Sequence, residues 1–391
     1  MLEVALGSSR ILARPGERRL WVLNSAAGAL WDLHAAGLEP ETIAGWLTRR
    51  FGVAEPAARA QVESQFAGWR DAGLFDSAAD PPPASAPGFE ADDLSLPVPV
   101  LAPAPAGAWR LRLGGRSVSL SIEAPELRQR LAPLIAPLRE KTVACVAHRL
   151  HLRGVPSRWT LQGNGVVLAA GTGTDGALVM TLDTLTEIGC RSTERLMVIH
   201  GAGLALNNGH GLLLIAPGGA GKTTLAAALN AEGHDLLSDD VVPVTPDGDL
   251  VGLGMPLCLK AGSWPVLTPR RPDLAMTAAV QRYGEPVRYL RPRGRRVCGP
   301  LPPGLVLFPR FQPGGTPCVE SLAPEVVLQG VVEAEAVIRD LTQPKLEAIA
   351  RWVCAMPAYA LNYPDLDSGL DLLRWILAGC EAGPSVPTGL N

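Results

Sequence analysis

Hydrophobic and polar residues alternate in the first 24 positions, in three short runs at residues 3–6, 11–13 and 19–23. Alternation at every second residue is typical of a strand with one buried face. Turn residues, Gly7-Ser8-Ser9 and Pro15-Gly16, separate the runs. We therefore expect a small three-stranded antiparallel sheet.

The hydrophobic period then changes to that of helices. Asn24 or Ser25 caps a first helix that runs through Leu33, Pro40 opens a second, and a third spans about residues 55–72. The apolar stripe of the third helix consists of Val62, Phe66, Trp69 and Leu74. Residues 1–76 are thus predicted to form a small winged-helix-like domain of three strands and three helices.

Residues 77–107 follow neither pattern. They begin with Ser-Ala-Ala-Asp-Pro-Pro-Pro, remain rich in proline up to Pro105, and have no apolar periodicity. This composition predicts an extended, semi-rigid linker. A second domain is expected at residues 108–380, followed by a C-terminal tail at 381–391.

The sequence of the second domain predicts a mixed sheet with helices, so the expected fold class of the protein is α+β or α/β. Strands are predicted at residues 109–113, 118–122, 143–152 and 160–169, and helices at about 126–138 and 183–194. Asn208-Gly209 predicts a two-residue hairpin turn between a strand at 197–206 and a strand at 212–215. In that register His200 lies opposite Pro217.

A glycine-rich turn follows this hairpin. Because glycine has no Cβ, the main-chain N–H groups of such a turn can converge on an anion, and the helix that follows adds its dipole. A lysine after the glycines can reach a phosphate oxygen, and the next threonine can ligate magnesium. The sequence therefore predicts a triphosphate-binding P-loop at residues 216–223, with Ala216 in place of its usual first glycine. The predicted nucleotide-binding residues are Pro217, Gly218, Gly219, Ala220, Gly221, Lys222, Thr223 and Thr224.

Two adjacent carboxylates, Asp239 and Asp240, end the strand after the P-loop helix. Like charges raise each other's pKa, so such a pair is costly unless something neutralises it. A magnesium ion would neutralise one carboxylate and leave the other as a candidate base. The alternative is an exposed turn with two surface aspartates.

Composition narrows the class of protein. The chain of 391 residues has a formal net charge of −3, which gives no general attraction to nucleic acid or to an anionic membrane. The apolar runs are too short to cross a bilayer, and the N-terminal residues do not resemble a secretory signal. Seven scattered cysteines without a Cys-x-x-Cys motif argue against zinc and against a disulfide framework. A reduced, cytoplasmic protein is expected.

The pattern of the first 76 residues, including LNSAAGALWDLHAAGLEPETIAGWLTRRFGV, resembles the PqqD family, the peptide-recognition domains of ribosomal-peptide (RiPP) modification systems. The resemblance implies that a precursor's leader peptide binds as an added strand beside the sheet, against the third helix. A free sheet edge supplies main-chain hydrogen bonds for such binding. The run 19–23 and the face 61–69 would then form the groove, although core packing explains Val62 and Phe66 better.

The motifs from His200-Gly201 through the P-loop to GHDLLSDD resemble the HPr kinase/phosphorylase family in order and spacing. The resemblance implies that Lys222 and Thr223 bind phosphates and magnesium, that Asp239 is the base, that Asp240 holds magnesium and that His200 supports Asp239. Relatives often form hexamers, so a homo-oligomer is one expected state. Two departures from the family's dual-activity members are Thr224 in place of a glutamate and the absence of a Glu-Val-Arg-Gly-like segment. They favour a dedicated peptide kinase over a sugar-transport regulator.

Together the two resemblances imply an ATP- and Mg²⁺-dependent kinase that phosphorylates a Ser or Thr hydroxyl of a precursor peptide, alongside other peptide-modification enzymes. Lys260, Arg293 and Arg295 are further candidates to contact phosphate or an acidic substrate, because phosphoryl transfer needs positive charge on the transferring oxygens. Two alternatives stay open at this point. One is a non-catalytic chaperone regulated by nucleotide, and the other is a serine kinase acting on an HPr-type carrier protein.

Overall fold

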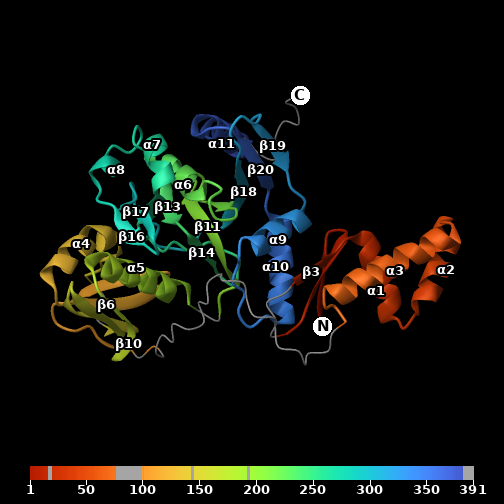
Figure 1. The fold of residues 1–391 in the computed structure, drawn as a ribbon, viewed down its shortest axis with the longest axis horizontal. Helices are drawn as coiled ribbons and strands as arrows, with labels where there is room; N and C mark the ends of the chain where they lie inside the picture. Colours follow the sequence, from red (N-terminus) through yellow and green to blue (C-terminus); the bar gives the residue numbers. More distant parts are fainter. Residues whose placement is uncertain (16–19, 76–98, 100, 142–144, 192–193, 382–391) are drawn as a thin grey trace. The chain divides into compact units, whose positions relative to one another are not determined.

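The computed structural model describes residues 1–15, 20–75, 99, 101–141, 145–191 and 194–381 (Figure 1). The chain divides into two compact units. The first comprises residues 1–93 and 340–354, and the second comprises residues 94–339 and 355–391. Each is described by itself below.

The first unit contains a three-stranded antiparallel sheet and helices, as predicted. Its strands are β1 (Leu2–Leu6), β2 (Ser9–Ala13) and β3 (Leu20–Leu23), in the order β1-β2-β3, and Arg19 lies outside the described residues. Helices α1 (Ser25–Ala35), α2 (Pro40–Phe51) and α3 (Glu55–Asp71) follow. The Asn24 side chain accepts a hydrogen bond from the Ala27 N–H and so caps α1, as its position predicted.

The two faces of this sheet are covered differently. Leu12, Trp21 and Leu23 point to one face and pack with the apolar stripe of α3. Ile11 and Ala13 point to the other face and are also fully buried. The remaining described element of this unit is helix α10 (Gln343–Ala355), which lies beside the sheet in Figure 1.

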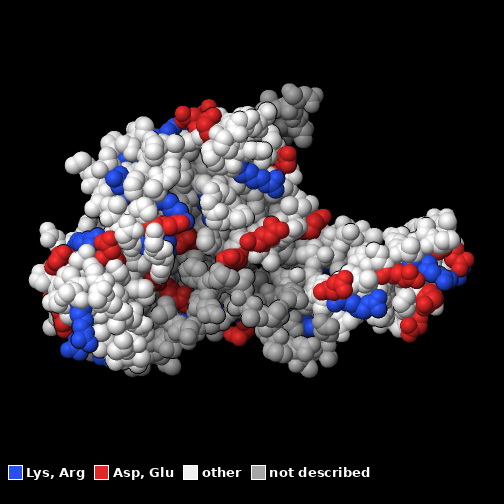
Figure 2. All heavy atoms as spheres, in the orientation of Figure 1, with Lys and Arg blue, Asp and Glu red and all other residues white. Residues whose placement is uncertain are grey.

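Helix α10 corrects the predicted domain boundaries, since residues 340–354 group with the N-terminal unit rather than with a continuous domain at 108–380. The physical reason is the second apolar face of the sheet, which needs a partner. Helix α10 offers Leu346, Ile349, Ala350 and Val353, all buried. Outside this core, acidic and basic side chains are interspersed over α1–α3 (Figure 2).

The second unit begins with a five-stranded sheet in the order β10-β9-β8-β6-β5. Its strands are β5 (Trp109–Leu113), β6 (Arg116–Ile122), β8 (His148–Val155), β9 (Arg158–Gly163) and β10 (Val166–Gly171), and α4 (Pro125–Ile135) and α5 (Thr174–Cys190) share its core. The helix predicted at 183–194 thus begins nine residues earlier and ends at Cys190. Its first half is apolar on most sides, which hides the helical period. Strand β4 (Ala102–Pro103) pairs with β7 (Cys145–Val146), so the predicted linker ends before residue 102.

A mixed seven-stranded sheet forms the centre of this unit, in the order β13-β11-β12-β18-β20-β19, with β14 also paired to β11. The strands are β11 (Met197–Ala205), β12 (Gly211–Ile215), β13 (Asp235–Ser238), β14 (Val241–Val244), β18 (Pro303–Phe311), β19 (Cys318–Ser321) and β20 (Ala358–Tyr363). Strands β12, β18 and β20 are parallel, whereas β11 is antiparallel to β12. Helices α6 (Lys222–Ala231) and α11 (Leu366–Glu381) contribute to its core, and α9 (Pro324–Glu333) lies in the chain between β19 and α10.

A small sheet, β15 (Leu257–Lys260), β17 (Glu285–Leu290) and β16 (Val280–Arg282), with short helices α7 (Trp264–Leu267) and α8 (Asp273–Met276), completes the unit. Because β13 and β12 are both antiparallel to β11, they run in the same direction. The carboxyl ends of β12, β13, β18 and β20 therefore meet at one edge of the central sheet.

Candidate functional site

The glycine-rich turn connects β12 to α6 at this edge. Strand β12 is buried along its whole length, while Pro217, Gly218 and Gly219 are exposed. Gly219 and Gly221 have φ angles of 85° and 92°, which only glycine adopts readily. Helix α6 begins at Lys222, and no side chain caps its N-terminus. The first N–H groups of α6 are therefore left for another acceptor.

Lys222 folds back over the turn. Its buried Nζ donates hydrogen bonds to the carbonyl oxygens of Ala216 at 2.5 Å and Pro217 at 3.1 Å. Burial lowers the pKa of Lys222, and the charges of Asp240 and Asp239 oppose that effect. The lysine is thus held at the turn, with two carboxylates close enough to influence it.

Asp239 and Asp240 interrupt a strand that otherwise continues along β11. Gly203 faces Ser238 on one side of the pair and His200 faces Val241 on the other, so the register is the same before and after it. Asp240 adopts a left-handed φ of 76°. This local break turns the two acids out of regular strand geometry at the same edge as the glycine-rich turn.

Asp239 is 5% exposed. Its Oδ2 accepts a hydrogen bond from the Cys258 N–H at 3.0 Å, whereas its Oδ1 is buried without a hydrogen-bond partner in the described part of the chain. Burial raises the pKa of Asp239 to about 6, the charge of Asp240 adds to the rise, and the Cys258 N–H and Thr223 hydroxyl oppose it. Asp239 therefore combines a buried, incompletely solvated carboxylate with a pKa close to neutrality, as a general base requires.

Asp240 is the partner of His200. The two side chains approach to 3.5 Å between Nε2 and Oδ1, and burial lowers the pKa of His200. This differs from the predicted pairing of His200 with Asp239. The hairpin register also differs by one residue, since Gly201 faces Ile215, which would place His200 opposite Ala216 rather than Pro217. The reason is a three-residue loop, Asn207-Asn208-Gly209, because Leu206 and His210 still form a main-chain hydrogen bond.

Arg282 also lies at this site, although sequence reasoning did not select it. Its Nη2 lies 3.3 Å from Asp183 of α5 and 3.5 Å from Asp240, and Tyr283 donates a hydrogen bond to Asp183 at 2.7 Å. Burial raises the pKa of Asp183 despite the opposing charge of Arg282. The only sequence signal for this arrangement is the Tyr283-Gly284 turn that makes β16 and β17 a hairpin.

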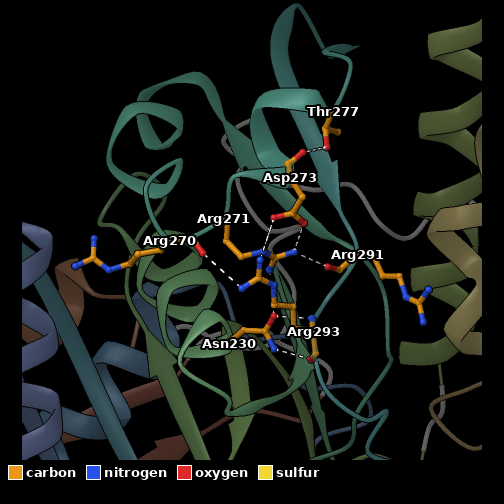
Figure 3. Close-up of polar contacts among 7 residues, drawn as sticks. All are labelled: Asn230, Arg270, Arg271, Asp273, Thr277, Arg291 and Arg293. Atoms are coloured by element: carbon orange, nitrogen blue, oxygen red, sulfur yellow. Dashed lines mark hydrogen bonds and ion pairs between the residues drawn. The ribbon is translucent and has the colours of Figure 1, made fainter.

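The three basic residues selected from sequence each have partners other than the glycine-rich turn and the two acids. Lys260 is exposed and pairs with Glu285 at 2.7 Å. Arg293 exchanges main-chain hydrogen bonds with the side chain of Asn230, and Arg295 is exposed and donates its N–H to Asp235 (Figure 3 shows Arg293 and Asn230). Asn230 lies about 12 Å along α6 from Lys222, at 1.5 Å per residue.

Buried Arg271 organises that distant end of α6. Its guanidinium binds Asp273, the carbonyl oxygen of Arg291 and Asn230. Figure 3 shows these contacts converging on Arg271. Arg293 therefore belongs to a structural cluster at the C-terminal end of the helix, away from the glycine-rich turn.

The residues at the turn fit a triphosphate with magnesium. The uncapped N-terminus of α6 suits phosphate oxygens, and the unpartnered Oδ1 of Asp239 needs a hydrogen-bond donor or a cation. Asp240 and Thr223 provide oxygen ligands of the kind that Mg²⁺ prefers. No group of three or more His, Cys, Asp or Glu side chains in the described ranges forms a cage for a metal by itself.

A second candidate site is the outer edge of β3. Strands β1 and β2 are joined by the two-residue turn Gly7-Ser8, and the last residue pair before this turn is Leu6–Ser9. In a two-residue hairpin the residues that flank the turn are hydrogen-bonded to each other through their main chains. Hydrogen-bonded and non-hydrogen-bonded pairs alternate along an antiparallel ladder, so Glu3, three residues before Leu6, belongs to a non-hydrogen-bonded pair and its N–H and C=O point away from β2. Gln343 of α10 binds both groups, which confirms the assignment and occupies the β1 edge.

The same alternation makes the main-chain groups of Leu20 and Val22 point outward from β3. Strand β3 pairs with β2 alone within the described part of the sheet, and Val22 is 37% exposed. Among the described residues, no strand pairs with the outer edge of β3, so this edge can accept an added strand, whereas that of β1 carries the Gln343 amide.

Residues 10–74 match the family model of coenzyme PQQ synthesis protein D (PqqD). The first unit contains a PqqD-like domain. The match covers all but the first residue of β2, the whole of β3 and helices α1–α3, so the resemblance inferred from sequence is confirmed over this range. No match to a curated protein was found for this chain. None of the described helices is long and apolar enough to cross a bilayer.

Proposed function

We propose that this protein is an ATP-dependent kinase that phosphorylates a Ser or Thr hydroxyl of a ribosomally synthesised precursor peptide, which the PqqD-like domain recruits. The observation that carries the catalytic half is the buried Asp239, with its unpartnered Oδ1 and raised pKa, beside Thr223 of the glycine-rich turn. The PqqD match and the open β3 edge support the peptide half.

Each residue of the turn has a role in this proposal. The α6 N-terminus and Lys222 bind the phosphate chain, and Lys222 exchanges its carbonyl partners for phosphate oxygens. Thr223 and Asp240 hold Mg²⁺, which supplies positive charge on the phosphate oxygens when bound. His200 orients Asp240, at 3.5 Å.

Asp239 acts on the acceptor. With a pKa of about 6 its carboxylate is largely ionised at neutral pH and can accept the proton of the peptide hydroxyl. The hydroxyl oxygen then bonds to the γ-phosphorus, the bond to the β-phosphate oxygen breaks, and ADP leaves. Most of the rate gain in such a transfer comes from positioning and charge stabilisation.

The peptide would join the sheet at β3. The outward N–H and C=O groups of Leu20 and Val22 pair with an extended leader, and side chains at alternate leader positions contact the unit's surface. Because the Gln343 amide occupies β1, the proposal assigns the leader to one edge only.

Replacement of Asp239 by Asn tests the catalytic half. The full chain is incubated with ATP, Mg²⁺ and the precursor peptide encoded by a neighbouring gene, and phosphate gain is read by mass spectrometry. D239N should abolish transfer and retain ATP binding, while D247N, in an exposed turn, should behave as wild type. Transfer by D239N would refute the base assignment, and nucleotide binding by the wild type without any transfer would favour the chaperone alternative.

Replacement of Val22 by Pro tests the peptide half. Proline removes the outward N–H of β3 without removing a hydrogen bond to β2, and edge strands tolerate it on that side. V22P should weaken precursor binding, whereas V22T keeps the donor and the β-branched shape and should not. Equal binding by V22P, V22T and wild type would show that the peptide does not use this edge.

A further inference from the structure

An aromatic pair lies at the carboxyl ends of β18 and β20, next to the glycine-rich turn. Phe311 faces Tyr363 in the strand register, and their ring centroids are 5.9 Å apart. Both residues are close to Gly221: a methyl group there would lie 2.7 Å from the Tyr363 hydroxyl and 4.0 Å from the Cβ of Phe311. The pair therefore borders the residue that precedes Lys222.

The two rings differ in exposure. Tyr363 is 3% exposed, packs in the core beneath α6 and α11, and donates a hydrogen bond to the Ala220 carbonyl at 3.4 Å. Phe311 is 51% exposed and has no polar atom that would favour contact with water. Tyr363 is thus fixed by the core and the turn, and Phe311 presents a ring beside it.

Strand alternation places Phe311 on the α6 side of the sheet. Leu305 and Leu307 of β18 belong to the core that contains α6, and residues at spacings of two share a face. Phe308, on the opposite face, contacts Gly330 of α9. The Phe311 ring is therefore on the same face of the sheet as the N-terminus of α6.

The order of strands separates the aromatic pair from the acids. Strands β11 and β13, with His200, Asp239 and Asp240, lie on one side of β12, and β18 and β20 lie on the other. A triphosphate bound at the α6 N-terminus with its γ-phosphate toward Asp239 must therefore direct its other end toward β18. That end carries the nucleoside.

We propose that Phe311, supported by Tyr363, forms the base subsite of the nucleotide site and stacks on a purine ring. The inference rests on the proposed nucleotide binding at the glycine-rich turn. Every base has a π-face, and stacking on an aromatic side chain gains free energy without hydrogen bonds that distinguish bases. The subsite therefore accepts adenine and guanine alike.

The test compares ATP with inorganic tripolyphosphate, which has the phosphates without the base. Affinities of the full-length protein for both are measured by calorimetry with Mg²⁺, for wild type, F311A, F311L and F311Y. F311A and F311L should weaken ATP binding by about 5- to 150-fold, the range that base–aromatic stacking supports, and should leave tripolyphosphate unchanged. F311Y should bind ATP as wild type does.

A matched control is Phe51, which is 63% exposed and also pairs with an aromatic neighbour, Trp46, at 5.4 Å. F51A should change neither affinity. Equal ATP affinity in F311A and wild type overturns the inference and leaves the nucleotide site intact. Equal weakening of both ligands in F311A and F311L also overturns it, because the ring would then support the turn instead. A wild type that binds neither ligand overturns the nucleotide site itself.

Discussion

Replacement of Asp239 by Asn should stabilise the protein in the absence of ligands, by an amount that depends on pH. The pKa of Asp239 is about 6 in the folded protein, against 3.8 for an unperturbed aspartate. Between these two values the folded state holds a proton that the unfolded state has released, so stability falls as pH rises through this window. Asparagine has no charge to bury and removes that loss.

The magnitude follows from the shift. One pKa unit corresponds to about 1.4 kcal/mol, so the shift of Asp239 corresponds to about 3 kcal/mol once the pH exceeds the folded pKa. About 0.5 kcal/mol of this is already present at pH 4, so the stability of D239N relative to wild type should rise by about 2.5 kcal/mol between pH 4 and pH 7.5. Any constant effect of the substitution, such as a changed hydrogen bond to Cys258, cancels in this difference.

Hydrogen exchange of peptides that cover residues 211–240 measures the local free energy of opening in both variants across this pH range. The matched control is D175N, because hydrogen bonds from the Gln281 N–H and Arg130 outweigh burial and lower the pKa of Asp175. The stability of D175N relative to wild type should fall as the pH rises from the lowered folded pKa to the unfolded value of 3.8, and should then stay nearly constant up to pH 7.5. The quantity compared is the free energy of opening of each variant minus that of wild type, as a function of pH. If this difference for D239N does not rise with pH, the claim that ionised, buried Asp239 destabilises the folded protein is refuted.

Three further predictions concern single positions. R271A should lower the free energy of unfolding by about 1–3 kcal/mol in urea denaturation, because Asn230 and the Arg291 carbonyl lose a buried donor, while Asp273, which is 47% exposed, can bind water instead. G221A should lower ATP affinity in calorimetry, since alanine is strained at a φ of 92° and its Cβ would clash with the Tyr363 hydroxyl. In the double variant G221A/Y363F the clash is removed but the backbone strain remains, so affinity should be restored only in part. Q343A should lower protection of the Glu3 amide in hydrogen exchange and destabilise the first unit by about 1 kcal/mol, as two exposed hydrogen bonds are lost.

Local signals predicted the strands and helices β1–α3 of the first unit well, but not the membership of α10. Turns at Gly7 and Pro15, the Asn24 cap and Pro40 each specify a neighbouring element through a few residues, so three strands and three helices follow from sequence alone. The start of α5 was missed for the opposite reason, because a helix buried on most sides has no polar face to reveal its period.

The sequence predicted the motifs of the candidate site, but not which side chains contact each other there. The glycine-rich turn and the two acids are contiguous in sequence, whereas the Asp240 contact of His200 depends on a hairpin register. Asn-Gly fits both a two-residue and a three-residue loop, and a shift of one residue changes which atoms meet. Arg282 and Asp183 are 99 residues apart, so only the fold brings them together.

Helix α10 makes the N-terminal unit depend on residues far along the chain. The N-terminal sheet buries Ile11 and Ala13 on the face away from α1–α3, and residues 340–354 belong to the same compact unit. A fragment that ends near residue 76 would expose that apolar face and free the main-chain groups of Glu3 now bound by Gln343. The peptide-recognition unit therefore cannot be completed until the chain has passed through the glycine-rich turn and the acids. Point substitutions such as V22P, rather than removal of the N-terminal segment, are for this reason the sound way to test the proposed peptide binding separately from the proposed phosphoryl transfer.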